Sequence, residues 1–236
     1  HFVEDTEGKW WAIYHSYEKG YESLGRKLLL SPVEFTRDGW FRISKPAEEA
    51  TPKPCGYIVE DTNTFSDNFS GKGISGWRAW GESNPARYHC LQKGLRIDGT
   101  GETIGKSHPL TIITGDHSYE TTVHVTCHEG CEAGIILQYN EEIYNAAALR
   151  DGKLCIYRLG KMLAQKDIGT NECWLRMKND DQYISFYYSL DGVTYKKMNY
   201  CINAISQNNN SYNGFLSLRP GIFAAGKGYA NWEDFT

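Results

Sequence analysis

Short hydrophobic runs separated by glycine-containing turns extend along most of the chain. Residues 119–125 (Tyr-Glu-Thr-Thr-Val-His-Val) alternate between faces with a period of two, and residues 173–178 and 183–189 show similar strand-like patterns. Such alternation predicts β-strands that bury one face. The dipeptide Asp191-Gly192 after the third run predicts a hairpin turn. Because no stretch has a 3.6-residue period, we predict an all-β protein, mostly an antiparallel sandwich of roughly a dozen strands.

The first 45 residues form a separate pattern of short strands. We predict these strands at residues 2–4, 10–15, 25–30, and 33–35 leading to 40–42. Gly8, Gly20 and Gly39 lie in the turns between them, where a positive φ is useful. Four antiparallel strands in about 45 residues have the size of one propeller blade. A lone blade exposes both faces, so we expect this segment to be the end of something larger.

A proline-rich stretch follows the first pattern. Pro46, Pro52 and Pro54 stand in a run without hydrophobic periodicity, which is typical of an extended linker. We therefore divide the chain into residues 1–45, a linker at 46–56, and a sandwich at 57–236. About 180 residues are enough for a complete β-sandwich.

Charge and composition limit the kinds of partner that this protein can bind. A net charge of −4 and a pI of about 6.0 argue against nucleic-acid binding. No apolar run approaches the roughly 20 residues of a membrane span. Seven cysteines are an odd number, which favours small buried thiols in a reduced protein but leaves the compartment open. The run Cys127-His128-Glu129-Gly130-Cys131 lacks the second pair that a zinc site would need.

Longer phrases resemble a known enzyme family. Residues 10–18 (Trp-Trp-Ala-Ile-Tyr-His-Ser-Tyr-Glu), 24–30 and 38–40 resemble the last blade of glycoside hydrolase family 43, five-bladed propellers that include β-xylosidases, α-L-arabinofuranosidases and arabinanases. The remainder is similar to the concanavalin A-like β-sandwich often attached to the C-terminus of such enzymes. Residues 133–140, 186–192 and 214–221 carry this second resemblance.

The resemblance implies a terminal blade of a five-bladed β-propeller followed by a concanavalin A-like sandwich. It implies the C-terminal portion of an inverting hydrolase for xylose- or arabinofuranose-containing plant-wall glycans, with no organic cofactor. Family members use an Asp as general base, a Glu as general acid and a second Asp that tunes the acid, all from earlier blades. No carboxylate here matches those positions, so we expect the chain alone to be inactive. Its partners would be a pentose-containing oligo- or polysaccharide and the missing blades, from the same parent chain or a second one.

Two residues match functional positions of the family. His15 corresponds to a histidine near the propeller axis that helps to hold a hydrated calcium ion, although one satisfied by backbone groups at a strand end is the alternative. Arg26 corresponds to an arginine that reaches into the sugar pocket. Its fixed fork of donors suits sugar hydroxyls and a neighbouring carboxylate. The alternative for Arg26 is a surface ion pair with Glu18 or Glu22.

The sandwich suggests two further sites. Asp67 and Asp234 stand near its two ends, where related sandwiches sometimes hold a structural calcium ion; a turn or capping role is the alternative. Four tryptophans suggest an alternative function, that of a non-catalytic carbohydrate-binding module. They are Trp77, Trp80, Trp174 and Trp232. Such a module needs exposed aromatic rings, whereas buried rings would only pack the core. A third hypothesis is a split or nicked enzyme whose two parts remain bound.

Overall fold

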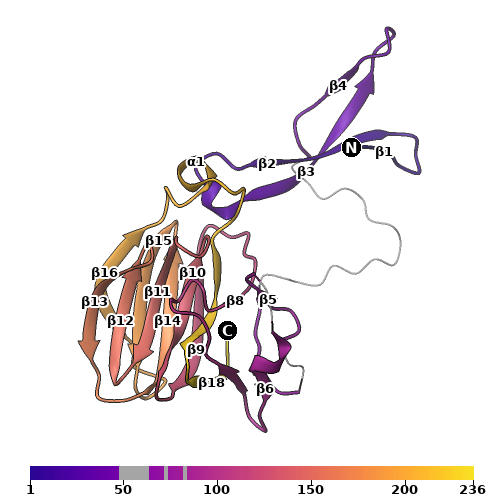
Figure 1. The fold of residues 1–236 in the computed structure, drawn as a ribbon. Coiled ribbons are helices and arrows are strands. Elements are labelled where there is room, and N and C mark those ends of the chain that lie inside the picture. Colours follow the sequence, from indigo (N-terminus) through magenta and orange to yellow (C-terminus); the bar gives the residue numbers. More distant parts are fainter. Residues whose placement is uncertain (48–63, 72–73, 82–83) are drawn as a thin grey trace.

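The computed structural model describes residues 1–47, 64–71, 74–81 and 84–236. Within these residues a small four-stranded sheet projects from one end of a two-layered β-sandwich (Figure 1). Residues 48–56 of the predicted linker lie outside the described residues. The predicted all-β class is confirmed.

The small sheet is antiparallel, with its strands in chain order. It contains β1 (Phe2–Glu4), β2 (Trp10–Tyr17), β3 (Arg26–Phe35) and β4 (Phe41–Ile43). The prediction was wrong about β3, which continues through Pro32 instead of ending before it. Pro32 is tolerated because pairing with β4 starts only at Val33, so the missing N–H costs no hydrogen bond within that ladder.

The sandwich consists of two seven-stranded antiparallel sheets. The first has the order β13 (Lys161–Asp167), β12 (Lys153–Arg158), β11 (Tyr144–Arg150), β10 (Cys131–Gln138), β17 (Arg219–Gly226), β8 (Leu110–Thr111) and β5 (Arg78–Ala79). The second has the order β16 (Lys196–Asn203), β15 (Tyr183–Ser189), β14 (Glu172–Asp180), β9 (Tyr119–Cys127), β18 (Tyr229–Glu233), β7 (Leu95–Asp98) and β6 (Tyr88–Cys90). Strands distant in sequence therefore pair, as β10 does with β17.

Helical structure is confined to short segments in the described part of the chain. They are the 3-10 turns η1 (Glu22–Leu24) and η2 (Pro85–Arg87) and the one-turn helix α1 (Asn209–Tyr212). The sequence predicted no helix at α1, because no stretch has a 3.6-residue period. The Asn208 side chain accepts a hydrogen bond from the Asn210 amide and so caps this turn. None of these helices is long and apolar enough to cross a membrane.

The main core lies between the two large sheets. β9 and β14 alternate buried and less buried residues, as their sequences predict. By contrast, β11 is buried on both faces from Tyr144 to Leu149. The second face of β11 belongs to another apolar cluster. In this cluster, Ile104 packs with Ile136 and Phe223. All six cysteines in the described residues are free thiols: Cys127, Cys131, Cys155 and Cys173 are buried, and Cys90 and Cys201 are exposed.

Candidate functional site

The small sheet is joined to the sandwich through the loop between β2 and β3. Ser23, in η1, is 1% exposed, and its hydroxyl donates to Oε1 of Gln182 across 2.8 Å. The same carboxamide donates from Nε2 to the Gly20 carbonyl, also across 2.8 Å. Gln182 comes from the turn between β14 and β15 and is 6% exposed. A buried polar junction therefore fixes one side of this loop.

The segment before β17 holds the other side of the loop. The Leu218 amide donates to the Ser23 carbonyl across 2.8 Å. A Cβ built on Gly25 would lie 2.8 Å from Cβ of Ser217, and Gly25 has a φ of +79°. Both the close approach and the positive φ require glycine here. The loop is thus enclosed between two segments of the sandwich.

A charged cluster surrounds this junction. The Glu18 carboxylate binds the Lys27 ammonium and accepts from Nε2 of His117 across 3.0 Å. Both contacts lower the pKa of Glu18, and the contact with Lys27 has the larger effect. The ring of Tyr21 stacks on His117 with centroids 3.5 Å apart, and its hydroxyl donates to Asp181. This hydrogen bond raises the pKa of Tyr21.

The two residues singled out in the first segment lie together. Arg26 opens β3 opposite Tyr17, and His15 lies on β2 opposite Leu28, so the two side chains are diagonal neighbours. Nη1 of Arg26 lies 3.2 Å from Nε2 of His15. A guanidinium only donates, so Nε2 accepts and the neutral ring carries its proton on Nδ1. His15 is therefore bound by a side chain instead of a backbone group.

Phe215, which the sequence did not single out by itself, completes this cluster. The guanidinium carbon of Arg26 lies 4.9 Å from the centroid of the Phe215 ring. This ring is 61% exposed and belongs to the loop before β17. In the described part of the chain Arg26 makes no ion pair, because Glu18 binds Lys27 and His117, while Glu22 accepts from the Gly20 amide. Arg26 thus keeps donors free for a ligand.

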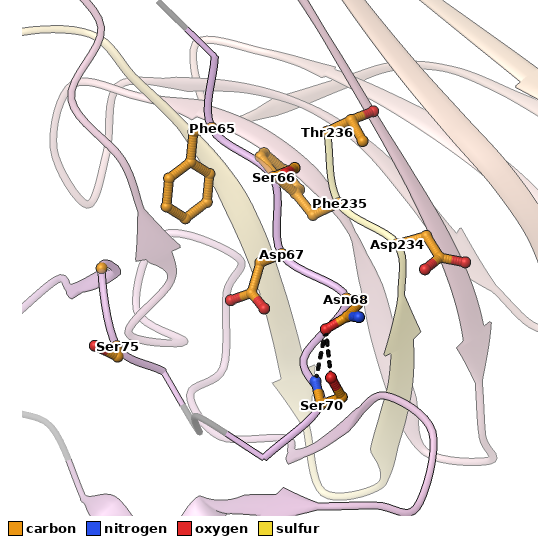
Figure 2. Close-up of a pocket in the computed structure, with 10 residues that line it drawn as sticks. Phe65, Ser66, Asp67, Asn68, Ser70, Ser75, Asp234, Phe235 and Thr236 are labelled. Atoms are coloured by element: carbon orange, nitrogen blue, oxygen red, sulfur yellow. Dashed lines mark hydrogen bonds between the residues drawn. The ribbon is translucent and has the colours of Figure 1, made fainter. Parts of the chain in front are cut away.

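Asp67 and Asp234 line one open pocket of about 640 Å³, where the first residues of the sandwich segment meet its last residues (Figure 2). Oδ1 of Asp67 accepts from the Phe69 amide across 2.7 Å, and Oδ2 accepts from the Trp77 indole across 2.8 Å. Asp67 also exchanges both backbone hydrogen bonds with Phe235. The Asp67 backbone therefore links the entering chain to the last residues of the sandwich, while its carboxylate holds the Phe69 amide and the Trp77 indole.

The side chains of Asp67 and Asp234 do not converge on a common point in this geometry. Figure 2 shows the carboxylates of Asp67 and Asp234 pointing away from each other. Among the described residues, no group of three or more His, Cys, Asp or Glu side chains is arranged to hold an ion. For His15, Nε2 accepts from Arg26 and Nδ1 carries the proton, so neither nitrogen offers a free lone pair. Calcium at either place stays a prediction.

Three of the four tryptophans singled out in the sandwich are occupied by packing, and Trp80 is partly exposed. Trp77 and Trp232 are buried in the core. The Trp174 ring stacks on His124 with centroids 4.1 Å apart. A Cβ built on Gly192 would lie 3.1 Å from the same indole, so the hairpin turn also packs against it. A sugar ring would have to displace one of these neighbours.

Comparisons with known proteins identify relatives of this architecture. The family model described as "Beta xylosidase C-terminal Concanavalin A-like domain" matches residues 66–236. Among solved structures, the GH43 BlXynB protein from Bacillus licheniformis superposes with a TM-score of 0.85 at 22% identity, covering 100% of this chain and 52% of its own. A xylan beta-1,4-xylosidase from Bacillus halodurans C-125 gives 0.79 at 16% identity, covering 99% and 52%.

A third structure, the GH43B protein of a Bacteroides ovatus xyloglucan locus, gives a TM-score of 0.82 at 19% identity, covering 99% and 52%. At these identities the likeness establishes the fold. The chain spans about half the length of these relatives. The curated proteins gave no match.

Proposed function

Since the chain belongs to the family of beta xylosidase C-terminal concanavalin A-like domains, we propose that it is the C-terminal portion of an inverting glycoside hydrolase. The proposed substrates are plant-wall glycans that contain xylose or arabinofuranose. The observation that carries the proposal is the cluster of Arg26, His15 and Phe215, which both parts of the chain build together. Its free guanidinium donors suit the hydroxyls of a sugar.

The apolar surface of the small sheet supports a role for residues 1–45 as the last blade of a propeller. Leu28 is 77% exposed and Trp40 is 69% exposed. Further exposed apolar side chains on this sheet are Phe2, Val3, Trp10, Phe35, Phe41 and Ile43. A surface of this kind indicates a missing protein neighbour. In the proposal, the preceding blades of the propeller cover it.

The chemistry divides between this chain and the missing blades. Inverting hydrolysis needs a general acid and a general base about 6.5–9.5 Å apart, which leaves room for the attacking water. The missing blades would supply both carboxyl groups. Arg26 would donate to a sugar hydroxyl and orient the substrate, because its planar fork has fixed directions. The Phe215 face supports the guanidinium, and His15 holds Nη1.

No step is assigned to calcium, because His15 in this arrangement does not fit a ligand role. A bound ion would supply a positive charge near the propeller axis. For that, His15 would have to release Arg26.

Pentoside hydrolysis tests the proposal. We expect the 236-residue chain alone to leave 4-nitrophenyl β-D-xylopyranoside and α-L-arabinofuranoside intact, and the native protein with the preceding blades to cleave at least one. Proton NMR should then show the inverted anomer as the first product. Failure of the native protein on both glycosides would refute the proposal.

A further inference from the structure

We propose that Gln182 is a positioning residue for Arg26: its buried carboxamide holds the loop that leads into β3 and thereby fixes where Arg26 projects. The inference rests on the proposed sugar-binding role of Arg26. It gives the sandwich a part in substrate recognition through a residue that never touches the sugar.

Gln182 is itself held rigidly. Its backbone amide donates to Oδ1 of Asn179 across 2.9 Å, and its backbone carbonyl accepts from the Ala204 backbone amide across 3.0 Å. Asp181 and Gln182 both have positive φ, at +51° and +70°, as the tight turn between β14 and β15 requires. The side chain therefore leaves a fixed backbone in a fixed direction.

The carboxamide uses both of its ends on the loop. Nε2 donates to the Gly20 carbonyl and Oε1 accepts from the Ser23 hydroxyl, both at 2.8 Å. A carboxamide supplies the donor and the acceptor side by side, as this arrangement requires. A carboxylate at this position would oppose the Gly20 carbonyl with a second acceptor. Alanine would leave the buried Ser23 hydroxyl without this partner.

The loop passes this constraint on to Arg26. Ser23 is also held through its carbonyl by the Leu218 amide, and Gly25 packs directly on Ser217. Arg26 follows Gly25 without an intervening residue, and its guanidinium lies over Phe215, from the same segment of the sandwich as Ser217 and Leu218. The same segment of the sandwich therefore holds both the backbone and the guanidinium group of Arg26.

Kinetics of the native protein test the inference. Gln182→Ala and Gln182→Glu should lower kcat/KM by about 10- to 100-fold, since small misplacements of a substrate-binding group have effects of this size. Gln165→Ala, an exposed glutamine on β13, is the matched control and should leave kcat/KM unchanged. In the Arg26→Ala background, Gln182→Ala should cost no further activity, because the two changes remove one function. Equal losses in both backgrounds would overturn the inference.

Hydrogen exchange separates this inference from the proposed function. In the 236-residue chain, Gln182→Ala should speed exchange of the amides at residues 20–28 by about tenfold, with β9 and β14 unchanged. Gln165→Ala should alter neither region. If the native protein cleaves no pentoside, the proposed function fails and the exchange result still decides whether Gln182 holds the loop. Unchanged exchange at residues 20–28 would overturn the inference.

Discussion

Nη1 of Arg26 lies 3.2 Å from Nε2 of His15, and the imidazole must accept this hydrogen bond because a guanidinium only donates. Two residues that the sequence assigns to different roles, one to sugar and one to an ion, therefore belong to a single cluster. This contact orients Arg26 and occupies the histidine lone pair that calcium would need.

Arg26→Lys should separate recognition from folding. Lysine keeps the positive charge but loses the planar fork, so we expect kcat/KM of the native protein to fall about tenfold or more. Because Arg26 is exposed, the substitution should change the unfolding free energy of the protein by less than about 0.5 kcal/mol. Steady-state kinetics and thermal unfolding measure the two effects. Arg158→Lys, at an exposed position on β12, is the control, and a parallel loss of stability and activity at Arg26 would argue against a pocket role.

Trp174→Ala should destabilise the sandwich without affecting any affinity for sugar. The indole packs on His124 and on the Gly192 turn, and its loss should lower the unfolding free energy by about 1–3 kcal/mol. Denaturant titration and xylan-affinity electrophoresis of the 236-residue chain provide the two measurements. Trp40→Ala, at an exposed ring, should leave stability nearly unchanged. Binding of xylan that disappears with Trp174 would instead support the carbohydrate-binding alternative.

Asp67→Asn should lower the unfolding free energy by about 1–3 kcal/mol, and by the same amount after chelation. An amide group would turn its NH₂ toward either the Phe69 amide or the Trp77 indole, so one hydrogen bond is replaced by a donor–donor contact. Asp234→Asn, at an exposed position, should have a small effect. The measurement is denaturant unfolding with calcium or with a chelator. A stability difference between the wild type and the Asp67→Asn variant that vanishes with the chelator would establish a calcium site.

Glu233 should contribute to the loss of stability in acid. The Lys93 ammonium at 2.7 Å, and then His124, lower the pKa of Glu233 from its ordinary value of 4.5. The contribution of Glu233 to the unfolding free energy is therefore present above its unfolded-state pKa. It is lost as the pH falls through the lower folded-state pKa.

Glu233→Gln should flatten the decline in unfolding free energy between about pH 5 and pH 3. Urea titrations across this range measure the slope. Glu129→Gln, at an exposed position in the turn after β9, should leave the slope as in the wild type. A steeper slope in Glu233→Gln would contradict the assigned ion pair.

The sequence predicts the strands well where one face is buried, as in β9 and β14. It fails at β3, because a proline in a strand pattern usually ends the strand, and here the position of Pro32 at the limit of the β4 ladder makes it harmless. The short helix α1 was missed because one turn of four residues has no periodicity to detect. The sequence resemblance to family 43 is confirmed by the family match.

The candidate site divides in the same way. His15 and Arg26 lie on strands joined by a short loop, so their proximity follows from local pairing. Gln182 stands 159 residues from Ser23, and nothing in the pattern of β14 and β15 indicates that the turn between them docks on this loop. Phe215 was equally hidden, since an exposed aromatic residue in a glycine-containing loop has no periodicity that assigns it to a site.

The mass of the native protein under denaturing conditions, taken from the fraction that hydrolyses 4-nitrophenyl pentosides, tests the central claim most directly. We predict that this fraction contains the 236-residue sequence within a chain heavier than 26.8 kDa, or together with a second chain that carries the remaining blades. Hydrolysis by a single species of 26.8 kDa, or no hydrolysis in any fraction that contains the sequence, would contradict it.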